Sequence, residues 1–300
     1  MPYDQRIMRF AGLDQVSLLT LQGRVLVAFL IGPYHRQRFD AHEPRQCHLA
    51  VRGDGQWFLL VVVKVPEGTP IPPTDFLGGD LGVVNLATPS DGTTHSGERI
   101  EACRTRYATY RQRLQRAATV AQMDGKRPKN MRRALQRTAR REARFRRDTN
   151  HGISKTLVAA AQGNEYGIAL EDLTALRTRT RFRKPQRARM AGWAFAQLRF
   201  FVEYKARLAG IPVVLVDPRN TSRQCRACGH ISTANRPSQA RFSCKQCGYT
   251  AHADCNAAVN IRSRARVNAP LVAGRVPQQL WLLAGVGASD KLRHFSASSH

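Results

Sequence analysis

The chain has 300 residues, of which 48 are Lys or Arg and 21 are Asp or Glu, so its formal net charge is +27. A chain this basic needs a polyanionic partner, and we expect nucleic acid and no small-molecule substrate. A hydrophobic content of 42% is enough for a folded core, but no apolar run is long enough for a membrane span and no basic amphipathic helix is evident, so we expect no membrane partner.

The N-terminal region predicts a small antiparallel β domain. Its β-rich runs are separated by turns that contain glycine, and they lie at residues 16–21, 24–31, 47–52 and 57–65. The next segment, residues 66–73, contains four prolines and predicts a linker. We therefore predict a partial β domain with its linker over residues 1–73.

The following segment, residues 76–100, predicts three strands, the first of which leads into Asp80. Gly79 and Gly82 flank this aspartate, and glycines within a strand indicate close approach of a ligand or of another backbone. A turn aspartate is the alternative interpretation. It is disfavoured because Asp80 lies between apolar strand residues, while the pair Asp91-Gly92 supplies the hairpin turn.

A strongly basic helical region comes next. Between residues 104 and 147 the chain has 16 Lys or Arg and only two acidic residues. A polar break at residues 124–130 predicts a helical hairpin over residues 101–149, and a more apolar helix continues over 150–163. A solvated charged face is the usual alternative, but such faces mix charges of both signs, whereas this one suits a phosphate backbone. The candidate nucleic-acid contacts here are Arg132, Arg133, Arg140, Arg144 and Arg147.

A buried strand is predicted at residues 166–173, ending in Glu171 and Asp172. Carboxylates beside an apolar run are costly unless they are paired or bind a metal. The next segment, residues 177–189, has seven basic residues and no acid. We interpret it as a loop that is disordered or that orders on nucleic acid, with candidate contacts at Arg179, Arg183 and Lys184. A helix over 193–208 and a strand over 211–216 follow.

Two Cys-x-x-Cys pairs, separated by fifteen residues, have the spacing of a four-cysteine zinc site; they are Cys225, Cys228, Cys244 and Cys247. Four thiolates leave no coordination position for water, so the predicted zinc is structural. Disulfides or a redox pair are the alternatives. They are disfavoured because residues 1–10 do not form a signal peptide, which indicates a reducing compartment. We expect a bacterial cytoplasmic protein that associates with the nucleoid, as a monomer or weak dimer.

Asp254 begins the last predicted helix, directly after the cysteines. The order of elements is three antiparallel strands, helix, strand, helix, strand and final helix, which is the order of RNase H-like α/β folds. That order brings Asp80, Glu171 and Asp254 together at one end of the sheet. Three such carboxylates would bind Mg²⁺ or Mn²⁺, and a pair of these ions catalyses phosphodiester hydrolysis.

Five motifs resemble TnpB, the OrfB-type protein of insertion sequences, which is related to the type V CRISPR effector nucleases. They are GGDLGVVNLATPSDG (78–92), FRRDTNHGISK (145–155), GIALEDL (167–173), VDPRNTSRQCRACGH (216–230) and HADCNAAVNI (252–261). The resemblance implies a RuvC-like nuclease over residues 74–266 with a zinc ribbon inserted at 221–250, preceded by a wedge-like, OB-like β domain. It implies that Asp80, Glu171 and Asp254 are the RuvC carboxylates and that the four cysteines bind zinc.

The resemblance further implies that a guide RNA and a target DNA are the partners. Family members carry a longer N-terminal part with a helical recognition lobe, so this chain is expected to be short at its N-terminus. Residues 267–300 predict a loosely ordered tail. We therefore expect a transposon-associated RNA-guided DNA endonuclease. The alternatives are a nucleic-acid-binding remnant that no longer cuts and a transposase that catalyses strand transfer.

Overall fold

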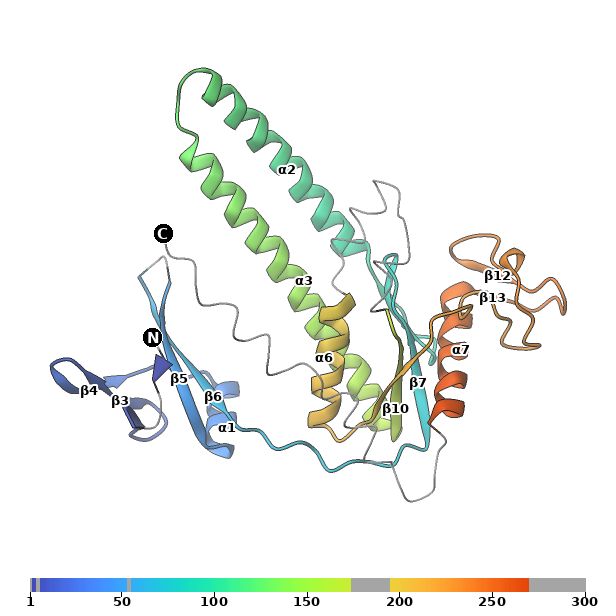
Figure 1. Cartoon of the computed structure of the whole chain (residues 1–300), viewed down its shortest axis with the longest axis horizontal. Helices are drawn as coiled ribbons and strands as arrows, with labels where there is room; N and C mark the ends of the chain where they lie inside the picture. The colour runs from blue at the N-terminus through green and yellow to red at the C-terminus, as the bar shows by residue number, and fades with distance from the viewer. Residues whose placement is uncertain (1, 4–5, 53–54, 174–194, 270–300) are drawn as a thin grey trace. The chain divides into compact units, whose positions relative to one another are not determined.

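The computed structural model describes residues 2–3, 6–52, 55–173 and 195–269. The predicted basic loop at 177–189, with Arg179, Arg183 and Lys184, lies outside the described residues, as does the tail beyond residue 269. The chain divides into two compact units, Met1–Glu67 and Gly68–His300, which are described separately (Figure 1). None of the helices within the described ranges is both long and apolar enough to cross a membrane.

The first unit contains two three-stranded antiparallel sheets. One consists of β2 (Met8–Phe10), β3 (Gln15–Thr20) and β4 (Gly23–Ala28), and the other of β1 (Pro2–Tyr3), β5 (Pro44–Val51) and β6 (Trp57–Val63). Met8, Val16, Leu18 and Cys47 form its buried core. The four strands predicted in this region are observed, each shifted by a few residues.

Two features of the first unit differ from the prediction. The strands β1 and β2 precede the first predicted one, and they are only two and three residues long. A helix, α1 (Pro33–Ala41), connects β4 to β5 and has no buried residue. The helix was missed because the apolar periodicity that marks a helix depends on a buried face, which α1 lacks.

The second unit is built on a five-stranded sheet with the order β11-β10-β7-β8-β9. Strands β7 to β9 are antiparallel, whereas β10 is parallel to β7 and β11 is parallel to β10. The strands are β7 (Asp75–Asp80), β8 (Asn85–Pro89), β9 (His95–Ser96), β10 (Tyr166–Glu171) and β11 (Val213–Val216). The predicted mixed α/β architecture is therefore observed.

Helices cover both faces of this sheet. Leu77, Ile168 and Leu170 pack against α3 (Lys129–Gly163) and α6 (Phe195–Leu208) on one face. Their strand neighbours Phe76 and Ala169 pack against α7 (Ala253–Asn268) on the other face. Because strand side chains alternate between faces, even-numbered positions of β7 and odd-numbered positions of β10 face α7.

Helix α7 lies directly on β7 at Gly78. A Cβ atom added to Gly78 would stand 2.2 Å from the carbonyl oxygen of Ala258, so only glycine permits this contact. At the start of β7, the buried Asp75 pairs with Arg262 and Arg266 from the last turns of α7. Burial alone would raise the pKa of Asp75, but the hydrogen bonds from Arg266 and Arg262 hold it well below its usual range.

The predicted helical hairpin is present as α2 (Glu98–Met123) and α3, which lie side by side (Figure 1). Arg111 of α2 and the buried Glu142 of α3 form an ion pair between the two arms. The second arm continues without a break into the apolar part of α3 that packs on the sheet. The second arm of the hairpin is thus continuous with a core helix.

The last elements are short strands of the cysteine-rich segment, followed by α7. β12 (Arg241–Ser243) and β13 (Thr250–His252) pair antiparallel. Helix α7 runs through Asn268, so residues 267 and 268 are helical, and the tail predicted from residue 267 starts too early.

Candidate functional site

The three predicted carboxylates come from three elements that meet at one edge of the sheet. Asp80 is the last residue of β7 and Glu171 the last of β10, and these two strands are parallel neighbours. Asp254 lies in the first turn of α7. Both strand residues point to the face that α7 covers, by the alternation described above. The fold therefore gathers the three acids on one face.

The protein neutralises only part of the negative charge gathered there. Burial, followed by the nearby carboxylates of Glu171 and Asp254, raises the pKa of Asp80 to about 8, while Arg236 opposes the shift. Burial also raises the pKa of Glu171, opposed by the hydrogen bond from Thr221. A bound cation would favour the ionised form of both acids, so the donor set suits a divalent metal ion.

Neighbouring polar side chains hold two of the three acids. Asn85 Nδ2 donates to Asp254 Oδ2 at 2.8 Å, and Arg236 Nη2 donates to Asp254 Oδ1 at 3.0 Å. The hydroxyl of the buried Thr221 donates to Glu171 Oε1. Sequence reasoning missed Asn85, Arg236 and Thr221, because each lies in a loop or at a strand end where no spacing rule applies.

Asp172 does not join the site. Its side chain is about half exposed and forms an ion pair with Arg199 at 3.1 Å. The next residue of a strand points to the opposite side from Glu171, which explains the different surroundings of the two acids. Of the two carboxylates at the end of β10, only Glu171 faces α7.

The four cysteines cluster as predicted. Cys225 Sγ lies 3.7 Å from Cys247 Sγ, and Cys228 Sγ lies 3.6 Å from Cys244 Sγ. Four sulfur atoms bound tetrahedrally at roughly 2.3 Å from one zinc ion would be about 3.8 Å apart, so the cluster fits zinc. Backbone N–H groups, first that of Cys247, lower the pKa of Cys244 to about 6, which favours its thiolate. A backbone hydrogen bond from His230 lowers the pKa of Cys228, but burial and the three other thiols outweigh it and raise that pKa overall.

Two glycines complete the cysteine turns. Gly229 and Gly248 have φ angles of +77° and +74°, and their N–H groups donate to the carbonyl oxygens of Cys225 and Cys244. Only glycine adopts this left-handed conformation without strain. Among the described residues, these four cysteines are the one group with ligand atoms within 4.8 Å of one another; the three carboxylates are not drawn together as closely.

Polar side chains on one face of α7, here called the polar ladder, form hydrogen bonds to the segment that leads into the cysteine cluster. They connect that segment to the acidic site, which consists of Asp80, Glu171 and Asp254. Asn256 accepts a hydrogen bond from Arg226 N and donates one to Gln224 O. Asn260 donates to Thr221 O and to Gln224 O. Arg264 donates to Asp217 O and to Gln224 Oε1. The three residues are four apart, so they share one face of the helix. The segment that contains Thr221 is thus bound to the helix that contains Asp254.

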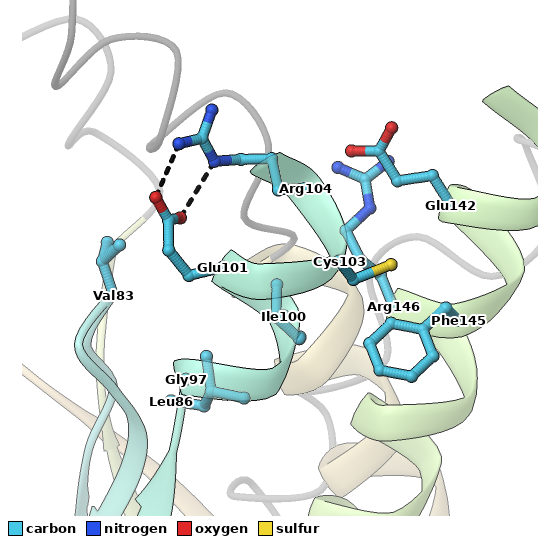
Figure 2. A pocket seen from close by; sticks show the side chains of 10 residues that line it. All are labelled: Val83, Leu86, Gly97, Ile100, Glu101, Cys103, Arg104, Glu142, Phe145 and Arg146. Carbon is cyan, nitrogen blue, oxygen red and sulfur yellow. Dashed lines mark hydrogen bonds and ion pairs between the residues drawn. The ribbon is translucent and has the colours of Figure 1, made fainter. Parts of the chain in front are cut away.

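The predicted nucleic-acid contacts of α3 are all exposed: Arg132, Arg133, Arg140, Arg144 and Arg147. They lie along the hairpin and do not gather with the three acids. A separate small pocket lies where α2 meets α3, lined among others by Val83, Cys103 and Phe145 (Figure 2). Glu101 and Arg104 pair at its rim. It holds little more than a water molecule and includes none of the three acids, so it is no substrate site.

Two family models match the chain side by side. The model described as a probable transposase, of the OrfB type of IS605 elements, covers residues 60–176 with Asp80 and Glu171. The model described as the Cas12f1-like TNB domain covers residues 195–261 with the four cysteines and Asp254. Residues 60–176 are therefore similar to OrfB-type proteins and residues 195–261 to the Cas12f1-like TNB domain, and the resemblance to TnpB-type insertion-sequence proteins is confirmed.

Curated relatives agree with the two models. The putative RNA-guided DNA endonuclease InsQ of Escherichia coli K12 is 31% identical over 69% of this chain and 53% of its own length. A CRISPR-associated endodeoxyribonuclease Cas12f1 of Sulfoacidibacillus thermotolerans is 43% identical over 40% of this chain and 27% of its own length. A TnpB-like protein of Methanocaldococcus jannaschii is 32% identical over 46% of this chain and 50% of its own. The chain spans about half of these relatives' length or less.

Solved structures share the fold. The cryo-EM structure of a CRISPR-Cas12f ternary complex matches with a TM-score of 0.53 and 20% identity, over 78% of this chain and 49% of that one. The mini-RNA-guided endonuclease CRISPR-Cas_phi3 matches with a TM-score of 0.55 and 13% identity, over 86% of this chain and 58% of that one. At these identities the likeness concerns the fold alone.

Proposed function

We propose that the protein is a transposon-associated RNA-guided DNA endonuclease that hydrolyses phosphodiester bonds with Asp80, Glu171 and Asp254. The observation that carries the proposal is the meeting of these acids, 83 to 174 residues apart in sequence, on one face of the sheet. The pKa of Asp80 is raised because a negative charge on this carboxylate is unfavourable, and a bound cation would compensate that charge. The names of the relatives support the guided endonuclease activity.

The strand order supports an RNase H-like core of the RuvC type. Three antiparallel strands followed by two parallel ones, with the acids on the first and fourth strands and on the last helix, are what such a core requires. In this proposal, residues 74–266 form the nuclease, with the basic hairpin (101–149) and the zinc ribbon (221–250) inserted. Residues 1–73 form part of a wedge-like domain.

Mg²⁺ or Mn²⁺ bound by the three carboxylates would activate the attacking water and stabilise the leaving oxygen. The protein's own contribution is to hold the carboxylates in place. Asn85 and Arg236 fix both oxygens of Asp254, and Thr221 fixes one oxygen of Glu171. Burial keeps bulk water from competing for these groups.

Guide RNA and target DNA are the proposed partners. The five exposed arginines of α3 face solvent along a helix that projects from the core, which suits contacts with a phosphate backbone. Zinc bound by the four cysteines would stabilise the ribbon and leave the chemistry to the carboxylates. We propose no small-molecule substrate.

The test is to purify the full chain co-expressed with its element, sequence the RNA that copurifies, and assay Mg²⁺-dependent cleavage of a target library with randomised flanks. We expect one discrete RNA and matching cuts. Asp80→Ala should abolish cleavage and retain RNA binding, because it removes one metal ligand and no basic residue. Cleavage that persists in this variant, or mixed RNA with no cuts from the unmodified protein, would contradict the proposal.

A second candidate is strand transfer, which the description of the matched family model as a probable transposase favours. The two candidates differ in their products. Hydrolysis leaves free 3′ and 5′ ends, whereas strand transfer joins an element end to a target strand. An assay that supplies labelled element ends separates them.

A further inference from the structure

One hydroxyl beside the acidic site has no partner. Thr88 of β8 is 1% exposed, and its Oγ1 makes no hydrogen bond to any described residue. A buried polar group without a partner costs free energy, so such a group in a native protein calls for an explanation. The surroundings of Thr88 supply one.

Thr88 lies directly opposite Asp80 in the antiparallel pair of β7 and β8. Opposite residues of such a pair point to the same face, with Cβ atoms about 4.5–5.5 Å apart. Asp80 points to the α7 side, so its cross-strand partner Thr88 points there too. The hydroxyl thus shares a face with the three acids.

Asp80 is also the acid that lacks support. Glu171 accepts a hydrogen bond from Thr221, and Asp254 accepts hydrogen bonds from Asn85 and Arg236. Within the described part of the chain, Asp80 has no side-chain hydrogen bond, and its neighbours act on it only through charge. An unsupported carboxylate and an unpartnered hydroxyl therefore face each other across one strand pair.

We propose that Thr88 is a positioning residue for Asp80. When the metal ion is bound, Thr88 Oγ1 donates a hydrogen bond to the carboxylate of Asp80 and fixes its orientation, as Thr221 does for Glu171. A change between staggered rotamers brings the two groups within reach. This role rests on the proposed function, because it assigns Thr88 to the metal site of that function.

The competing explanation is that Thr88 only fills space in the core. Thr88→Val separates the two, because valine keeps the shape and removes the hydroxyl, and Thr88→Ser is the matched control, because serine keeps the hydroxyl. If Thr88 only fills space, the Thr88→Val protein would bind metal like the unmodified protein and would unfold at the same or a higher temperature. If Thr88 positions Asp80, the Thr88→Val protein would bind metal more weakly, whereas the Thr88→Ser protein would bind it about as well as the unmodified protein.

The experiment is isothermal titration of Mn²⁺ into the zinc-loaded full chain without nucleic acid, with thermal unfolding of the same samples as a check on folding. Loss of a group that orients a metal ligand weakens metal affinity about 10- to 100-fold, so we expect about a tenfold loss for Thr88→Val and near-normal affinity for Thr88→Ser. Thr88→Ala replaces the valine variant if that variant does not fold.

Two outcomes would overturn the role of Thr88: Mn²⁺ affinity that Thr88→Val leaves unchanged, or serine and valine variants that are equally weak. Asp80→Ala, titrated in parallel, tests the site itself. If the unmodified protein binds no Mn²⁺, or if Asp80→Ala binds it equally well, the metal site of the proposed function is wrong. If binding depends on Asp80 but not on Thr88, only the role of Thr88 is wrong.

Discussion

At the scale of single residues, the acidic site combines groups that oppose one another without a cation. Asp80, Glu171 and Asp254 repel when ionised, and the ion pair of Arg236 with Asp254 brings an opposite charge into the site. Burial and repulsion together keep Asp80 protonated at neutral pH in the metal-free protein. This state has a measurable consequence for stability.

We expect the metal-free protein to lose stability as the pH rises. The pKa of Asp80 is about 8 in the folded state against an ordinary value of 3.8 for an aspartate exposed to water, so between these values the folded state binds a proton that the unfolded state lacks. The free energy of unfolding is therefore largest below the unfolded pKa and falls towards pH 8. The loss from this group is on the order of a few kcal/mol.

The measurement is urea unfolding of the zinc-loaded, magnesium-free protein from about pH 6 to about pH 8. Asp80→Asn is the matched control, because asparagine keeps the shape and has no proton to lose, so its stability should change less with pH. Added Mg²⁺ should reverse the loss in the unmodified protein, since the cation favours the ionised carboxylate. Equal pH dependence of the two proteins would contradict the assignment to Asp80.

The sequence revealed the acids of this site but not their supports. A carboxylate at the end of a buried strand stands out because its environment is unfavourable without a partner. Asn85, Thr221 and Arg236 are ordinary polar residues in loops or at a strand end, and they become informative only through partners up to 169 residues away. The tertiary fold alone brings such pairs together.

At the scale of elements, the position of α7 on β7 sets the distance between Asp254 and Asp80. Gly78 permits the close approach of the two backbones, and the ion pairs of Asp75 fix the far end of the helix. The apolar run that leads into Asp80 predicted the strand, and Asp254 marked the start of the predicted helix. Their contact at Gly78 could not be predicted, because the sequence shows two adjacent glycines and not which one faces the helix.

Gly78→Ala and Gly79→Ala should therefore have different effects. A Cβ atom at Gly78 would meet backbone atoms of Ala258 and Arg262 at 2.2 and 2.6 Å, whereas one at Gly79 would first meet the tip of the Leu170 side chain at 3.0 Å. Overpacking of this kind costs about 1–3 kcal/mol. We expect Gly78→Ala to lower the free energy of unfolding by about that amount and to lose most Mn²⁺ affinity, because α7 must shift.

Gly79→Ala serves as the control, since a flexible side chain can yield where a helix backbone cannot. Urea unfolding and Mn²⁺ titration of both variants check the expectation. If the two substitutions were equally mild, α7 would not be held by the contact at Gly78. The position of Asp254 would then depend on the ion pairs of Asp75 instead.

At the scale of the whole molecule, the cysteine cluster and the acidic site are parts of one arrangement. The polar ladder of α7 binds the segment that leads into the ribbon, and Thr221 on that segment holds Glu171. Arg236, between the two cysteine pairs, holds Asp254. The spacing of the cysteines predicted the cluster, but the link between the two sites arises from contacts that no motif specifies.

Removal of zinc should therefore impair the carboxylate site at a distance. Without the ion the four sulfur atoms have nothing to hold them together, so Arg236, which lies between the two cysteine pairs, loses its fixed position and Asp254 loses one of its two supports. We expect Cys247→Ser, or treatment with a zinc-selective chelator, to lower Mn²⁺ affinity and DNA cleavage together, although no carboxylate changes.

Cys103→Ser, which alters a cysteine outside the cluster, should leave both Mn²⁺ affinity and DNA cleavage unchanged. Zinc content, Mn²⁺ titration and cleavage measured on the same samples decide the matter: a zinc-depleted protein that still binds Mn²⁺ normally would show that the ribbon does not support the acids.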